Sequence, residues 1–251
     1  MFKGLSMIAQ LRQRLLALQR APGLRKGPGT LPLGIPAIDT MLGDGLMRGA
    51  LHEISAPGEA HLAAVTGFAL GLAALSAPSP RLVLIAEDMA LAESGALHGA
   101  GLDAFGLAPE RLVMVAVAHR RDLLWAMEEA LRCRTVNAVI GEIRCGGIDS
   151  VAARRLSYAA AESGALALLL RASPSNDAST AATRWIVGTA RSVGTHGPGA
   201  PRISAQLIRN RRGPVGSWIL EWSDSDGQFI LATLAQPVAA PTLDRPHRQV
   251  A

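Results

Sequence analysis

The segment LGIPAIDTMLGDGLMRGALHEISAPGEAHLA, residues 33–63, decides how the chain is interpreted. Its apolar run Leu51–Ser55 predicts a buried strand, and a helical pattern covers residues 62–75. The loop between them stands where a strand-to-helix phosphate loop would lie. Such a loop needs a lysine, but only Lys3 and Lys26 of the 25 basic residues are lysines, and neither follows a predicted strand. The G-x-x-x-x-G-K-[ST] phosphate loop is therefore absent from the sequence.

Composition and residue spacing narrow the class of protein. The 251 residues are 49% hydrophobic and 18% charged, which suffices for a large α/β core and excludes a wholly disordered chain. The sequence has no apolar run of the roughly 18 to 20 residues that a membrane helix needs, and no signal-peptide pattern. Cys133, Cys145 and the six histidines do not fall at metal-ligand spacing. We therefore expect a soluble cytoplasmic protein without a bound metal.

Short apolar runs alternate with helical patterns from residue 31 onward. Strands that are apolar on both faces and joined by helices are typical of a buried parallel sheet. After about residue 200, consecutive strands with short turns predict antiparallel addition at the sheet edge. The predicted fold is therefore α/β, a mostly parallel sheet flanked by helices with antiparallel edge strands near the C-terminus. The expected strands are 51–55, 82–86, 112–117, 138–140, 165–170, 203–209, 217–222 and 229–231, and the expected helices are 62–75, 88–100, 121–134, 148–163 and 178–190, with Trp185 in the last helix.

The two ends of the chain differ from the predicted domain at 31–236. Residues 1–30 hold six of the 25 basic residues and none of the 20 acidic ones. Apolar residues recur within this arm at helical spacing, which predicts a basic amphipathic helix. Three roles fit it: docking on its own or a neighbouring subunit, contact with a partner or nucleic acid, and binding to a membrane surface. Residues 237–251 are predicted to be a disordered tail. The apolar stripe of the arm is Ile8, Leu11, Leu15 and Leu18.

The stretch from Leu33 to Ile54 resembles the segment that leads into the phosphate loop of RecA-like proteins, where a short helix, a glycine-rich bend and a strand precede the loop. In the loop itself both glycines, the lysine and the hydroxyl residue are replaced. Glycines let N–H groups curl around a phosphate, the lysine neutralises its charge and the hydroxyl ligates Mg²⁺. We therefore expect no nucleotide cofactor here. The degenerate loop comprises Ala56, Pro57, Gly58, Glu59, His61, Leu62 and Ala63, of which Ala56 and His61 replace the glycines, Leu62 the lysine and Ala63 the hydroxyl residue.

Two acidic and two basic residues match functional positions of RecA-like proteins. Glu87 follows a predicted strand at the position of the carboxylate that orients the attacking water, and Glu142 stands at the position of the Mg²⁺-side aspartate. Without the lysine and the hydroxyl, we interpret both as vestigial and assign no catalytic residue. Arg209 and Arg211 match the paired basic residues that reach a neighbour's nucleotide. Here they are open to a partner, a phosphate backbone, solvent or an intramolecular bond.

The resemblance covers residues 30–235, and its details point to one family. The erased phosphate loop, the basic N-terminal helix and the stretch RNRRGPVGSWILEW at residues 209–222 look like the ImuA family. This resemblance implies a non-catalytic accessory role in error-prone translesion DNA synthesis during the bacterial SOS response to DNA damage. It implies two partners, an ImuB-type relative of Y-family polymerases and an error-prone C-family DNA polymerase, with RecA as a further candidate.

DNA contact and two alternative functions stay open. RecA-like proteins touch single-stranded DNA through two loops, which match residues 144–148, with one arginine, and 173–180, with no base and no aromatic residue. One alternative is a divergent ATPase that binds single-stranded DNA, with Arg48 or Arg81 in place of the lysine. The other is a cell-division inhibitor. The candidate partner or DNA contacts are Arg12, Arg14, Arg20, Arg144, Arg209, Arg211 and Arg212.

Overall fold

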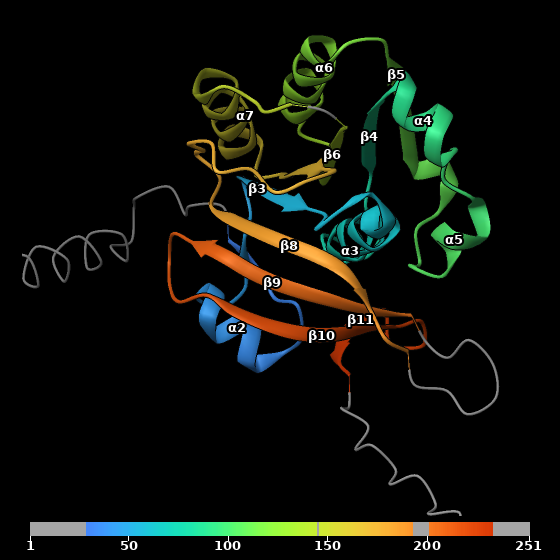
Figure 1. The fold of residues 1–251 in the computed structure, drawn as a ribbon, viewed down its shortest axis with the longest axis vertical. Coiled ribbons are helices and arrows are strands. Elements are labelled where there is room, and N and C mark those ends of the chain that lie inside the picture. The colour runs from blue at the N-terminus through green and yellow to red at the C-terminus, as the bar shows by residue number, and fades with distance from the viewer. Residues whose placement is uncertain (1–28, 145, 193–200, 233–251) are drawn as a thin grey trace, which may run out of the picture.

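A nine-stranded sheet forms the centre of the fold in the computed structural model, which describes residues 29–144, 146–192 and 201–232 (Figure 1). The strand order is β11-β10-β9-β8-β3-β7-β6-β4-β5. The strands from β8 to β5 run parallel, whereas β9, β10 and β11 are added antiparallel at one edge. The predicted α/β fold class is therefore confirmed. The strands are β3 (Ala50–Ser55), β4 (Leu82–Glu87), β5 (Leu112–Val117), β6 (Ala138–Ile143), β7 (Leu166–Arg171), β8 (Thr183–Ala190), β9 (Arg202–Asn210), β10 (Gly216–Ser223) and β11 (Gln228–Leu231).

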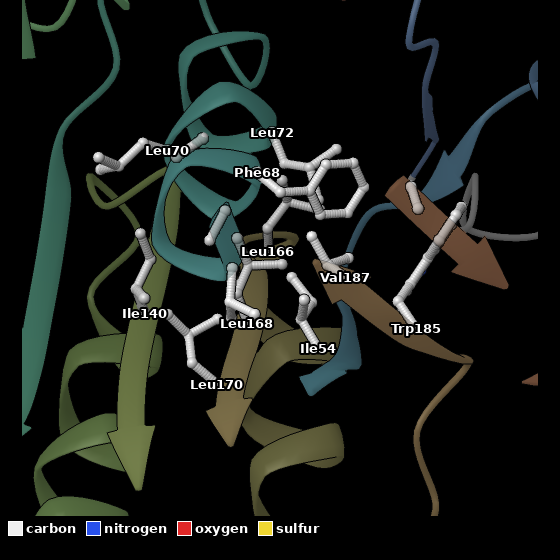
Figure 2. Packing of buried hydrophobic residues seen from close by; sticks show 14 of the residues in the cluster. Ile54, Phe68, Leu70, Leu72, Ile140, Leu166, Leu168, Leu170, Trp185 and Val187 are labelled. Atoms are coloured by element: carbon white, nitrogen blue, oxygen red, sulfur yellow. The ribbon is translucent and has the colours of Figure 1, made fainter. Parts of the chain in front are cut away.

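Helices cover both faces of the parallel strands because these strands are apolar on both sides. In β7, Leu166, Leu168 and Leu170 pack towards α3, as Figure 2 shows, while Ala167 and Leu169 pack towards α6 and α7. The sheet therefore separates two cores. The face with α3 (Leu62–Ala74) also carries α2 (Pro36–Leu42), α4 (Asp88–Ser94) and α5 (Gly99–Asp103), and the other face carries α6 (Arg120–Arg132) and α7 (Ser150–Ser163).

The segment before β3 is a small ladder and a short helix. A two-stranded ladder pairs β1 (Thr30–Leu31) with β2 (Leu46–Met47), and α2 lies between them in the chain. The Asp39 carboxylate accepts the Leu33 N–H at 2.7 Å and the Gly34 N–H at 3.1 Å, which closes the turn before α2. Gly43, with φ 72°, ends α2 in the left-handed conformation. The short helix, glycine bend and strand implied by the RecA-like resemblance are all present.

One predicted helix is wrong and another is interrupted. Residues 178–190 form a loop and then strand β8, and Trp185 lies in a strand with 1% exposure rather than in a helix. The β-rich run TRWIVGTA pairs with β3 on one side and β9 on the other, so sheet pairing decides its structure. The predicted helix 88–100 is broken after Ser94, because Gly95 adopts φ 75° and α5 begins only at Gly99.

Several predictions concern residues outside the described part of the chain. The arm at 1–30, apart from Gly29 and Thr30, and the tail at 237–251 fall there, as do Arg12, Arg14 and Arg20. Among the residues that the model describes, no helix is both long enough and apolar enough to cross a membrane.

Candidate functional site

The carboxyl ends of β3, β4, β6 and β7 meet at one edge of the sheet, where ligands bind in open α/β folds. The degenerate loop follows β3 at this edge. It forms a 3₁₀ turn, Glu59–His61, that runs directly into α3. Gly58 is extended at φ 177°, and residues 55–63 contain no left-handed backbone position. The His61 N–H bonds the Gly58 carbonyl at 3.0 Å, so this amide closes the turn instead of facing a ligand.

The His61 side chain anchors the loop to β8. Its Nδ1 accepts the backbone N–H of Thr189 at 3.1 Å and lies 2.9 Å from the Thr189 hydroxyl. Gly188 permits this approach, since a Cβ there would stand 3.1 Å from Pro57 Cγ and 3.3 Å from His61 Nδ1. The imidazole that replaces the second glycine therefore holds the loop against the sheet.

The two family-matched carboxylates meet around one arginine. Glu142 on β6 lies 3.1 Å from Arg144 Nη2, and Glu87 at the end of β4 accepts the Arg144 backbone N–H at 3.2 Å. The guanidinium also bonds the Ala90 carbonyl at 3.3 Å and the Ser94 hydroxyl. Only 10% of the Arg144 side chain and 15% of the Glu142 side chain are exposed. We call Arg144, Glu142, Glu87 and Glu93 the Arg144 cluster.

The Arg144 cluster contains three carboxylates and one guanidinium, so its net formal charge is negative. Glu93 Oε2 lies 3.8 Å from Arg144 Nε, which has no hydrogen-bond partner in the described structure. Burial raises the pKa of Glu142, the Arg144 charge lowers it, and the charges of Glu87 and Glu93 raise it further. The guanidinium therefore pairs with Glu142 and Glu93, while Glu87 bonds the backbone N–H of the same arginine.

A cavity of about 500 Å³ lies beside the loop, between α3 and the α4–α5 segment. Leu62, Ala63 and Phe105 supply apolar walls, and Glu59 and Glu142 supply acidic ones. Among the residues that the model describes, no lysine or arginine lines it. The proposed substitutes for the lysine lie at the opposite ends of the strands: Arg48 precedes β3 and bonds the Ser76 carbonyl at 2.7 Å, and Arg81 precedes β4. A strand of six residues spans roughly 20 Å, so neither guanidinium reaches this cavity.

Arginines from β7, β8, β9 and the turn after β9 hold the two loops that match the DNA loops of RecA-like proteins. In loop 172–182, Arg209 and Arg211 each donate to the Ser179 carbonyl at 3.1 Å. Arg184 donates to the Ser175 carbonyl at 2.5 Å and the Asp177 carbonyl at 3.2 Å. Arg171 donates to the Gly146 carbonyl at 3.3 Å in the other loop. Of the options left open for Arg209 and Arg211, the structure shows the intramolecular bond.

Glu53 forms a buried ion pair that was not predicted from the sequence. Glu53 on β3 is 1% exposed, pairs with Arg184 Nε at 2.9 Å and accepts the Ser179 hydroxyl. An acid inside a strand of the buried sheet, in the run LHEIS at residues 51–55, was the available signal for a buried ion pair. Arg212, a candidate contact, donates to the Gly43 carbonyl at 2.9 Å from an exposed turn.

His52 is fully buried and joins three elements. Its two ring nitrogens lie 2.8 Å from Thr183 Oγ1 and 2.8 Å from the Met47 carbonyl, and Trp185 donates to the same hydroxyl at 2.8 Å. All three hydrogen bonds form when His52 Nε2–H donates to the Met47 carbonyl and His52 Nδ1 accepts the proton of the Thr183 hydroxyl. In that state the imidazole of His52 is neutral. Burial lowers the pKa of His52 to about 4, although the bond to Met47 opposes the shift.

Comparison with known proteins gives both a fold and a relative. No protein-family model matches the chain. The chain is 28% identical to Protein ImuA from two strains of Caulobacter vibrioides over 222 residues, which cover 79% of this chain and 86% of that protein. A crystal structure of the RadB recombinase is similar with a TM-score of 0.57 and 14% identity, over 80% of this chain and 98% of that one. These similarities confirm the resemblance to the ImuA family and the RecA-like fold.

Proposed function

We propose that this ImuA-like chain is a non-catalytic accessory protein of error-prone translesion DNA synthesis in the SOS response. The sequence similarity to Protein ImuA supports this role. The RecA-like fold supplies a rigid sheet, and the protein acts by presenting surfaces to other proteins rather than by turning over nucleotide.

The Arg144 cluster carries this proposal. In a nucleotide-binding relative of this fold, carboxylates at these strand ends work with a metal ion and a bound triphosphate. Here the Arg144 guanidinium pairs with Glu142 and Glu93 from within the chain, and it also bonds the Ala90 carbonyl and the Ser94 hydroxyl. This built-in cation offsets part of the negative charge that would attract Mg²⁺ to this edge.

The degenerate loop gives a second reason to expect weak binding of a triphosphate. A cation about 4 Å from a phosphate contributes about 4 kcal/mol at an effective dielectric of ~20. Losing it weakens binding by about three decades. Leu62 supplies no such charge, and Glu59 and Glu142 line the neighbouring cavity with negative charge. The 3₁₀ turn at Glu59–His61 also offers no ring of inward N–H groups.

The partners follow from the ImuA resemblance. An ImuA-type chain operates with an ImuB-type protein and an error-prone C-family polymerase, and we propose that this chain joins the two. The test is co-expression of the full chain with these two proteins from the same genome, followed by size-exclusion chromatography without added nucleotide. We expect the three proteins to elute together. Elution of this chain alone would contradict the adaptor role.

A mutagenesis assay separates the adaptor from an ATPase. Glu142→Gln removes the carboxylate charge but keeps an amide that can accept a hydrogen bond. We expect damage-induced mutagenesis to stay at the wild-type level in cells that carry this variant. A loss of mutagenesis with the protein still folded and abundant would favour the divergent ATPase.

A further inference from the structure

The cavity beside the degenerate loop has apolar walls and no assigned occupant. Its volume of about 500 Å³ falls within the range of sites that bind ligands. It lies between α3 and the α4–α5 segment, and Figure 1 shows these helices next to one another. Gly67, Gly95 and Gly101 line it without adding side chains. The larger apolar residues of its wall are Leu62, Leu70, Leu97, Leu102 and Phe105.

The charge around this cavity is negative even after the internal ion pairs are counted. Residues 56–74 and 88–105, which form the loop, α3, α4 and α5, contain no lysine or arginine, and two histidines and four acids are their only titratable residues. The nearby cation, Arg144, is already shared by Glu93 and Glu142. Glu59 lines the cavity, is exposed and makes no ion pair with another described residue. The four acids are Glu59, Asp88, Glu93 and Asp103.

The cavity therefore suits an occupant that combines apolar groups with positive charge. A nucleotide or a DNA phosphate would be repelled by the acids around it. A second copy that presented the same face would place acids against acids. The chain itself contains a segment with both of the required properties, the basic arm before the described domain.

The arm carries its positive charge on both sides of its apolar stripe. Residues 1–28 hold six basic residues and no acid. In the predicted helix, with about 100° per residue, the stripe is about 80° wide, and Arg12 and Arg14 lie about 40° beyond its two sides. A helix that laid this stripe on the apolar wall would therefore place an arginine on each side of the cavity. The stripe consists of Ile8, Leu11, Leu15 and Leu18.

The arm joins the domain close enough to reach the cavity. The Gly29 carbonyl accepts the Arg48 N–H at 2.9 Å, and the Arg48 side chain bonds the carbonyl of Ser76, just after α3. The junction is therefore near the C-terminal end of α3, a helix of roughly 20 Å. The chain between Leu18 and Gly29 spans up to about 35 Å when extended. Attachment to the same chain also gives the arm a high local concentration at the cavity.

We propose that residues 1–20 dock as a helix on this cavity of their own chain, with the apolar stripe against its wall and with Arg12 and Arg14 towards the surrounding acids. Of the three roles that the sequence leaves open for the arm, this is docking on its own subunit. The inference rests on the proposed function in one respect, that no nucleotide occupies this edge. It does not depend on the complex with the ImuB-type protein and the polymerase.

Photo-crosslinking in the full chain tests the docking. Benzoylphenylalanine replaces either Leu11, in the stripe, or Gln13, which lies about 180° from the centre of the stripe. Mass spectrometry then maps the crosslinked peptides. We expect the probe at Leu11 to crosslink to residues 59–70 or 94–105, and the probe at Gln13 to give at least about threefold less of this product. A mixture of isotope-labelled and unlabelled chains distinguishes links within one chain from links between two copies.

Two pairs of variants that carry the Leu11 probe test the site itself. Gly101→Leu adds a side chain at a lining position where a Cβ meets open space, and Gly99→Leu adds the same side chain to α5 outside the lining. Glu59→Lys reverses a charge of the lining, and Glu110→Lys reverses an exposed charge outside it. We expect the two lining variants to lower the crosslink yield at least about threefold and the two controls to leave it unchanged.

Four results would overturn the proposal. The Leu11 probe could crosslink elsewhere on the domain, crosslink to a second copy, give no more product than the Gln13 probe, or keep its yield in both Gly101→Leu and Glu59→Lys. If any of these occurs while the chain still elutes with the ImuB-type protein and the polymerase, the docking fails and the adaptor stands.

Irradiation in the presence of about 1 mM Mg²⁺ATP separates this proposal from the proposed function. An unchanged crosslink yield agrees with both. A yield that falls when nucleotide is added would support an arm docked at this cavity, and it would contradict the proposal that no nucleotide binds at this edge.

Discussion

Replacing Arg144 by methionine tests whether this arginine is the cation that holds the carboxylate cluster together. Arg144→Met keeps an apolar stem and removes the guanidinium from Glu142 at 3.1 Å and Glu93 at 3.8 Å. Removing one partner of a buried ion pair costs about 3–5 kcal/mol. Because 10% of the arginine and 15% of the glutamate side chain are exposed, we expect the lower end of that range, about 3 kcal/mol, at pH 8.

The pH dependence of this loss follows from Glu142. Burial already raises the pKa of Glu142, and Arg144 is the group that lowers it. Without Arg144 its folded-state pKa rises further above the unfolded value, so the folded state binds the extra proton. Stability of the variant relative to wild type then falls as pH rises. We expect a small cost at pH 5 and the full cost at pH 8.

Urea unfolding of wild type, Arg144→Met and the double variant Arg144→Met/Glu142→Gln at pH 5 and pH 8 measures the effect. Gln removes the unpaired charge, so the double variant should be more stable than Arg144→Met at pH 8. A loss below about 1 kcal/mol at pH 8, or a loss equal at both pH values, would refute the assignment. So would a double variant that is less stable than Arg144→Met at pH 8.

Three further predictions concern the core and the loops. His52 has a folded-state pKa of about 4 against 6.5 when unfolded, so its contribution to stability should be full above about pH 6.5 and fall by about 3 kcal/mol as pH drops to 4; the loss over this range should be smaller by about that amount in His52→Gln, and an unchanged loss would contradict the buried neutral imidazole. Gly71→Ala should destabilise the protein by about 1–2 kcal/mol in urea unfolding, because its Cβ would lie 2.4 Å from the ring of Phe229, whereas the matched Gly67→Ala, 3.7 Å from the nearest side-chain atom, should stabilise it by up to about 1 kcal/mol; equal effects would count against this packing. The double variant Arg209→Ala/Arg211→Ala should speed amide hydrogen exchange in residues 175–181 while leaving β7 protected, since both arginines hold the Ser179 carbonyl; unchanged exchange would show that these bonds do not hold the loop.

The parallel strands β3, β4, β5, β6 and β7 were predictable because each is a short apolar run next to a helical pattern. The antiparallel edge was predictable from turn residues such as Gly213 and Pro214. Strand β8 was not, because its sequence fits either element and its pairing partner, β3, lies about 130 residues earlier in the chain. The break in the predicted helix 88–100 depends on a single left-handed backbone position at Gly95.

The positions of Glu87 and Glu142 in the chain were predictable from the sequence, but their contacts with Arg144 were not. The sequence alone placed Glu87 and Glu142 at strand ends and showed that the loop lacks its lysine. It assigned Arg144 to a loop that contacts DNA or a partner, whereas in the structure its guanidinium pairs with Glu142 and Glu93 and its backbone N–H bonds Glu87. Which acid an arginine meets depends on the strand order β7-β6-β4, and local sequence carries no information about that order.

A titration of the full chain with Mg²⁺ATP by isothermal calorimetry tests the central claim. The claim is that Arg144, rather than Mg²⁺ and a nucleotide, is the partner of Glu142. The account predicts no saturable binding up to about 1 mM nucleotide, and the same result for Glu142→Gln. Saturable binding with a Kd below about 10 µM that disappears in Glu142→Gln would contradict it, because the carboxylate would then be serving a bound metal and nucleotide.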